Sequence, residues 1–176
     1  MELTIRQETE SDHHAVFQLI KEAFSNMEMS DHQEHFLVAR LRKSSAFIPE
    51  LSLMAELEGK IVGHIILTRI KIKKGLNTHD SLALAPVSVL PDHQKKGIGG
   101  RLITAAHEKA RTLGFTSVVL LGHKEYYPKF GYVTAGTFGI ELPFDVPKEY
   151  CMAIELKQDG LSGVAGIVEY PKEFFE

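Results

Sequence analysis

The stretch that decides the fold runs from residue 87 to residue 102 and reads Val87-Ser88-Val89-Leu90-Pro91-Asp92-His93-Gln94-Lys95-Lys96-Gly97-Ile98-Gly99-Gly100-Arg101-Leu102. An apolar strand ends, a short loop turns, and a helix begins among glycines. The first turn of a helix has four backbone N–H groups without an internal partner, and the helix dipole adds positive potential there. Glycine lacks a Cβ, so an anion can approach this backbone closely, and Lys95 and Lys96 add charge. The sequence therefore predicts a phosphate or pyrophosphate site at this turn.

The spacing of the glycines decides between phosphate ligands. The nucleoside-triphosphate loop requires Gly-x-x-x-x-Gly-Lys-Ser/Thr, a string that this sequence lacks. The dinucleotide fingerprint requires a third glycine where Leu102 stands. The chain instead has Gln-x-x-Gly-x-Gly at residues 94–99, after a strand that ends in Val-x-Val-x-Pro. This combination resembles the acetyl-coenzyme A signature of the Gcn5-related N-acetyltransferase (GNAT) family.

The order of the expected elements around this stretch is also similar to that family. Hydrophobic periodicity predicts strands at residues 3–6, 51–57, 61–72, 81–90 and 115–121, and further strand-like segments from residue 132, including 151–156 and 164–170. Helices are expected at 15–24, from about 30 to 43, at 97–112 and, as a short piece, at 125–130. Residues 73–80 are polar and are expected to form an exposed loop.

Pro86 interrupts the apolar strand that leads into the signature. A proline removes a donor from the strand ladder, so it marks an edge, a bulge or a place where pairing stops. The resemblance implies that two parallel strands part here to admit the pantetheine arm. It implies an α/β GNAT fold with a mixed, mostly antiparallel twisted sheet of about seven strands, flanked by helices and splayed between the fourth and fifth strands. We expect one N-acetyltransferase domain over residues 1–176. Gly63-His64-Ile65 and residues 142–147 are similar to the YhbS-like subgroup of predicted acetyltransferases.

Composition excludes several other classes of protein. The 176 residues are 44% hydrophobic and 24% charged, which is ordinary for one globular domain. Twenty basic and 23 acidic residues leave a net charge of −3, so the chain as a whole is not expected to bind nucleic acid. It has no apolar run of membrane-spanning length and no signal-peptide pattern at its start. Cys151 is the single cysteine, which leaves no disulfide or multi-cysteine metal site and favours a cytoplasmic location.

The resemblance implies an acetyl-CoA-dependent N-acetyltransferase that moves an acetyl group directly from the thioester to an amine, without a metal. Backbone groups of Val87, Ser88 and Val89 would bind the pantetheine amides, and one of their N–H groups would polarise the thioester carbonyl. The pyrophosphate would lie against the first turn of the helix. The implied cofactor-binding residues are Val87, Ser88, Val89, Gln94, Lys95, Lys96, Gly97, Ile98, Gly99 and Gly100.

Residues 127–132, Tyr-Pro-Lys-Phe-Gly-Tyr, resemble the family segment that carries a catalytic tyrosine. The resemblance places Tyr127 near the sulfur as the acid for the leaving thiolate, and a phenol with a pKa of about 10 is protonated at neutral pH. Tyr126 is adjacent and is the alternative. The general base stays open between ordered water and four side chains, namely Glu56, His64, His123 and Glu125.

The acceptor of the acetyl group is not encoded in any readable motif. An amine-bearing small molecule or peptide is expected, contacted by loops near residues 26–30, 73–80 and 136–147. No nucleic acid or membrane partner is expected, and the chain is expected to be a monomer or a homodimer. The alternative function is a non-catalytic coenzyme A sensor or protein-interaction module on the same fold.

Overall fold

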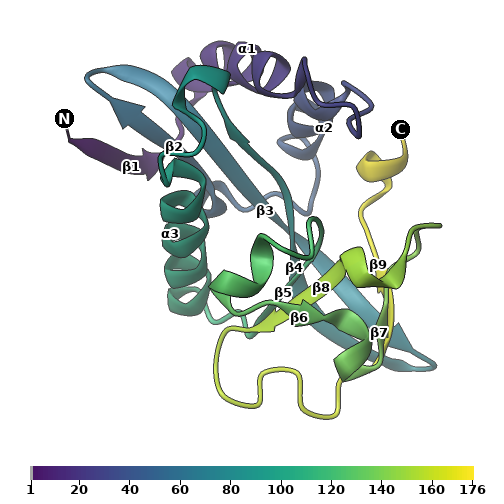
Figure 1. Cartoon of the computed structure of the whole chain (residues 1–176). Helices are drawn as coiled ribbons and strands as arrows, with labels where there is room; N and C mark the ends of the chain where they lie inside the picture. Colours follow the sequence, from purple (N-terminus) through teal and green to yellow (C-terminus); the bar gives the residue numbers. More distant parts are fainter. Residues whose placement is uncertain (1) are drawn as a thin grey trace.

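Helices cover both faces of a twisted nine-stranded sheet in the computed structural model, which describes residues 2–176 (Figure 1). The strands are β1 (Leu3–Gln7), β2 (Ser52–Leu57), β3 (Lys60–Lys74), β4 (Asn77–Val89), β5 (Ser117–Leu121), β6 (Val133–Thr134), β7 (Ile140–Glu141), β8 (Cys151–Glu155) and β9 (Gly166–Glu169). The helices are α1 (His13–Phe24), α2 (Glu34–Leu41) and α3 (Ile98–Thr112). The short 3₁₀ helix Tyr127–Phe130, labelled η4, follows β5. No helix of the described residues is both long and apolar enough to cross a membrane.

The strand order confirms the predicted fold class. Seven strands form the path β1-β2-β3-β4-β5-β8-β6, in which β4 and β5 are parallel and the other neighbours are antiparallel. Two short strands extend the sheet beyond the expected seven: β9 pairs with the far half of β3, and β7 pairs with β9. β9 lies inside the strand-like segment expected at residues 164–170, whereas β7, with two residues, is too short to produce a hydrophobic period.

The prediction of an exposed loop at residues 73–80 is wrong. β3 runs to Lys74 and β4 starts at Asn77, so only two residues connect the strands. Lys74 pairs with Asn77, and Gly75, with φ +59°, makes the tight turn between them. The polar residues lie on the exposed end of a β-hairpin and not in a loop. Lys71 and Asp80 form an ion pair across this hairpin, with 2.6 Å between Nζ and Oδ1. Twelve residues of β4 separate the turn from Val89, roughly 40 Å of strand. This hairpin therefore lies far from the signature turn.

Packing explains why the helices form where they do. Val16, Leu19, Ile20 and Ala23 make the buried face of α1, and Leu102, Ile103, Ala106 and Ala110 that of α3. A capping box precedes α1, in which the Thr9 N–H donates to the Asp12 carboxylate at 2.8 Å. The second helix starts at Glu34, later than expected, because the preceding residues form a turn in which His32 has φ +59°. A side chain on Gly63 would contact Leu102 of α3, so α3 packs directly on this face of β3.

Candidate coenzyme and active site

The parallel strands β4 and β5 separate after two residue pairs. Leu82 pairs with Val118 and Ala83 with Val119, and these are the pairs found between the two strands within residues 2–176. Beyond them β4 continues to Val89 and β5 to Leu121. Ile65 pairs with Val87, and Leu67 pairs with Leu84. Residues 85 and 86 of β4 therefore lie opposite the single β3 residue between them, Ile66. Pro86 therefore marks a β-bulge at the start of the opening. We call this gap, between residues 84–89 and 120–121, the β4–β5 opening.

Hydrogen-bond alternation shows which backbone groups face the β4–β5 opening. The Leu90 N–H donates to the Val62 carbonyl at 2.9 Å, and His64 is the register partner of Ser88. In an antiparallel pair the hydrogen-bonded positions alternate, so the backbone N–H and C=O of Ser88 point toward β3. Those of Val87 and Val89 point to the opposite side, into the opening. Of the three predicted backbone contacts, geometry therefore favours Val87 and Val89 and not Ser88.

The loop after β4 holds the N-terminus of α3 close to the end of β4 at Val89. The Gln94 side chain donates from Nε2 to the Val89 carbonyl at 3.0 Å, which ties the loop to the end of the strand. Gly97 caps the helix with φ +81° and Lys95 has φ +62°, both in the left-handed region. The first N–H bonded back into the helix is that of Arg101, to the Gly97 carbonyl at 3.1 Å. The N–H groups of residues 98–100 are consequently available to an anion.

The three glycines of the signature do different things. A Cβ on Gly97 would meet nothing within 4 Å, so Gly97 faces open space. A Cβ on Gly99 would lie 3.1 Å from the Tyr126 hydroxyl, and one on Gly100 would lie 3.3 Å from the Phe130 ring. Gly99 and Gly100 thus allow η4 to pack closely on the first turn of α3. The sequence analysis explains Gly99 and Gly100 by the space that an anion needs. The structure adds a second reason, which is close packing against Tyr126 and Phe130.

Tyr127 is packed at the end of β5. Its ring stands edge-on to that of Tyr132 with the ring centroids 5.8 Å apart. A Cβ on Gly122 would lie only 2.3 Å from Tyr127 Cε2, so Gly122 is the residue that makes room for this ring. Burial, and then the neighbouring Tyr126, raises the pKa of the Tyr127 hydroxyl well above its usual range. Tyr127 is therefore protonated at neutral pH and can act as a proton donor. Sequence reasoning missed Gly122, because its role depends on this contact.

The predicted base candidates lie in very different surroundings. Glu56 on β2 accepts a hydrogen bond from Arg6 Nε at 3.1 Å, at the β1 side of the sheet. His123 and Glu125 are exposed between β5 and η4. His64 is fully buried, and burial lowers its pKa below the usual value. The structure thus does not bring these four side chains together.

His64 belongs to a buried polar network assembled from four segments of the chain. Arg42 donates two hydrogen bonds to the Glu8 carboxylate at 3.0 and 2.9 Å, and Ser52 donates a third. His64 Nε2 lies 3.1 Å from Ser52 Oγ and 3.5 Å from Glu8. Burial alone raises the pKa of Glu8, but hydrogen bonds from His64 and Arg42 outweigh it and hold that pKa far below its usual range. The network connects the end of β1 and the C-terminus of α2 to β2 and β3.

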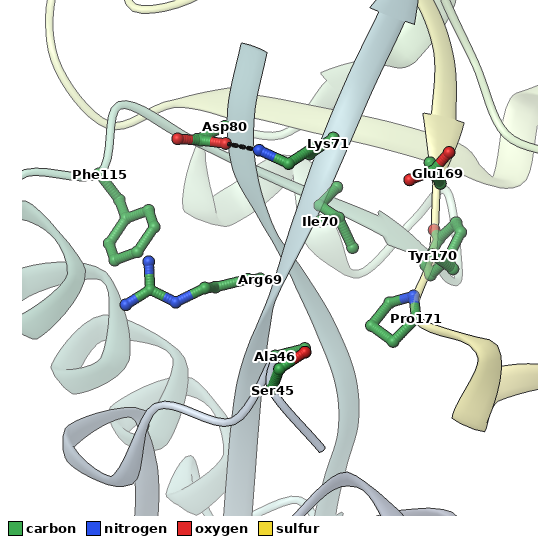
Figure 2. Close-up of a pocket in the computed structure, with 10 residues that line it drawn as sticks. All are labelled: Ser45, Ala46, Arg69, Ile70, Lys71, Asp80, Phe115, Glu169, Tyr170 and Pro171. Atoms are coloured by element: carbon green, nitrogen blue, oxygen red, sulfur yellow. Dashed lines mark hydrogen bonds and ion pairs between the residues drawn. The ribbon is translucent and has the colours of Figure 1, made fainter. Parts of the chain in front are cut away.

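A second concave region lies at the far half of the sheet, away from the signature turn. It has a volume of about 320 Å³ and lies where Pro171, Ser45 and the edge of β3 meet. Figure 2 shows Arg69 reaching toward Phe115 and Lys71 paired with Asp80 at its rim. Within residues 2–176 there is no group of three or more His, Cys, Asp or Glu side chains able to hold a metal ion.

An opening between two parallel strands, with a free helix N-terminus at the end of one of them, is typical of acyl-coenzyme A-binding α/β folds. The model of the acetyltransferase (GNAT) family matches residues 13–132. The chain belongs to the GNAT family of N-acetyltransferases.

Named relatives and solved structures agree with this assignment. The chain is 41% identical over 119 residues to the uncharacterized N-acetyltransferase YjhQ of Escherichia coli K12, a match covering 67% of this chain and 66% of YjhQ, slightly under two thirds of that relative. The structure of YhbS from Escherichia coli in complex with CoA superimposes with a TM-score of 0.89 at 23% identity, covering 100% of this chain and 93% of YhbS. A GNAT acetyltransferase from Brucella melitensis in complex with acetyl-CoA has a TM-score of 0.79 at 31% identity, with 98% of both chains covered.

Proposed function

We propose that this chain is an acetyl-CoA-dependent N-acetyltransferase, one domain over residues 1–176, that transfers acetyl directly to an amine of a small molecule or peptide. The observation that carries the proposal is that β4 and β5 part after Ala83–Val119 and that the Gln94–Val89 hydrogen bond ties the loop before α3 to the end of β4. The coenzyme complexes of YhbS and of the Brucella enzyme support it. The single cysteine favours a reducing compartment such as the cytoplasm.

The residues present fit the coenzyme. Its phosphates would be bound by the N–H groups of Ile98, Gly99 and Gly100 and by the charges of Lys95 and Lys96, with Gly97 leaving the approach open. The backbone N–H and C=O of Val87 and the N–H of Val89 would pair with the amides of the pantetheine arm. Gln94 acts indirectly, since its amide already bonds the Val89 carbonyl.

When bound, acetyl-CoA supplies the acetyl thioester that the amine attacks. A backbone N–H of β4 that faces the opening stabilises the negative charge developing on the thioester oxygen. Tyr127 donates its proton to the departing sulfur, because burial keeps this phenol protonated. The amine proton passes to ordered water or to His123 or Glu125, the two base candidates that are exposed beside η4.

The proposal is tested by release of free thiol from acetyl-CoA in the presence of pooled primary amines and peptides. Amine-dependent thiol release supports the proposal. Melting temperature adds a second test, because a ligand that binds only the native state raises it. Acetyl-CoA should raise it, whereas ATP and NAD at equal concentration should not. Stabilisation by acetyl-CoA without thiol release against any amine would favour the coenzyme A sensor instead.

A further inference from the structure

Tyr126 and Tyr127 are adjacent in sequence but face different surroundings. The Tyr127 ring lies against Gly122, whereas the Tyr126 hydroxyl lies against the first turn of α3, 3.1 Å from the position of a Cβ on Gly99. The two rings are nearly perpendicular, at 84° with centroids 5.1 Å apart. Burial raises the pKa of the Tyr126 hydroxyl, which therefore stays protonated at neutral pH. Its O–H is a hydrogen-bond donor beside the free N–H groups of residues 98–100.

Lys129, on η4, places a positive charge beside the Tyr126 ring. Its Nζ lies 4.1 Å from the centroid of the Tyr126 ring and 5.5 Å from that of Phe130. The lysines that form ion pairs within residues 2–176 are Lys71, Lys73 and Lys124. The charge of Lys129 is consequently not compensated by a carboxylate, and neither are those of Lys95 and Lys96. In a chain of net charge −3, this is a local concentration of positive charge around one helix N-terminus.

We propose that Tyr126 and Lys129 form a second wall of the coenzyme site, in which the Tyr126 hydroxyl donates a hydrogen bond to the pyrophosphate and Lys129 neutralises part of its charge. This inference rests on the proposed function, since it needs coenzyme phosphates at the α3 N-terminus. It divides the roles of the adjacent tyrosines: Tyr126 positions the coenzyme and Tyr127 handles the proton. It also gives Gly99 a reason to lack a side chain, because a Cβ there would press on the Tyr126 hydroxyl.

The test is calorimetric binding of coenzyme A and of dephospho-coenzyme A, which keeps the pyrophosphate but lacks the 3′-phosphate. Tyr126→Phe removes only the hydroxyl and retains the ring that Lys129 contacts. A hydrogen bond to a charged group is strong enough that the Kd for both ligands should rise about tenfold. Lys129→Gln should weaken both ligands about two- to fivefold and reduce the salt dependence of binding. Lys129→Arg should restore most of the affinity.

Lys124→Gln is the matched control, because Lys124 lies between β5 and η4 but forms an ion pair with Glu149 at 3.1 Å. This variant should bind coenzyme A and dephospho-coenzyme A as tightly as the wild type. Tyr126→Phe that binds coenzyme A as tightly as the wild type, or more tightly, would overturn the proposal. A loss confined to coenzyme A, absent for dephospho-coenzyme A, would move the contact to the 3′-phosphate and overturn it as well. Failure of the wild type to bind either ligand would instead refute the proposed function.

Discussion

Gly122→Ala tests whether the position of the Tyr127 ring governs turnover. The added methyl group would lie 2.3 Å from Tyr127 Cε2 and 2.9 Å from Cδ2, whereas ordinary contact begins near 3.4 Å. The ring must therefore retreat by about 1 Å. Overpacking of this kind costs about 1–3 kcal/mol, which lowers the melting temperature by roughly 2–12 °C in a chain of this size. A displacement of about 1 Å at a catalytic group lowers turnover about 100-fold.

The assay measures thiol release at saturating acetyl-CoA, well below the melting temperature of the variant, with calorimetric coenzyme affinity measured alongside. Any amine that supports turnover serves as acceptor, and slow hydrolysis of acetyl-CoA is the readout without one. Gly59→Ala is the matched control, because a Cβ there meets nothing within 4 Å, while its φ of +77° makes a side chain costly to the fold. Gly59→Ala should lower the melting temperature and leave turnover as in the wild type. Normal turnover in Gly122→Ala, with its melting temperature lowered, would refute the assignment of the Tyr127 ring to catalysis.

Three further predictions follow from the site and the core. Tyr127→Phe should lower kcat by about 10²–10⁴-fold with little change in coenzyme affinity, measured by thiol release and calorimetry; unchanged kcat would exclude Tyr127 as the acid. Gly97→Asp places a carboxylate where the backbone faces open space, so calorimetry should find no coenzyme binding although circular dichroism finds the fold retained. Burial, with Arg111 nearby, lowers the pKa of His107 to about 4, so the folded state binds fewer protons than the unfolded state and loses stability as pH falls below about 6.5. Urea unfolding at pH 7.5 and pH 5 should show this contribution falling by about 2 kcal/mol in the wild type, and a smaller fall in His107→Gln.

The sequence was sufficient for the parts of the fold that local pattern encodes. The order of strands and helices, the start of α3 after Gly97 and the interruption at Pro86 all follow from hydrophobic period, glycine and proline. The sequence predicts a loop at residues 73–80 where the structure has a hairpin, because the polar residues of an exposed strand end resemble those of a loop. The strands persist because β3 pairs with β4 along one edge and with β9 along the other.

The site itself depends more strongly on contacts between distant segments. The backbone direction of Ser88 is set by its register with His64, and the role of Gly99 by its approach to Tyr126. The buried network of Glu8, Arg42, Ser52 and His64 joins four segments, and the burial that separates His64 from the exposed base candidates appears only in the folded chain. No local period carries this information, so these assignments required the three-dimensional arrangement.

The most direct test of the central claim is a crystal structure of the chain with acetyl-CoA bound. The account predicts the pyrophosphate against the N–H groups of Ile98, Gly99 and Gly100, and the pantetheine arm in the β4–β5 opening beside Val87 and Val89. Coenzyme found instead at the basic rim of the far cavity, near Arg69 and Lys71 (Figure 2), with the β4–β5 opening empty, would contradict it.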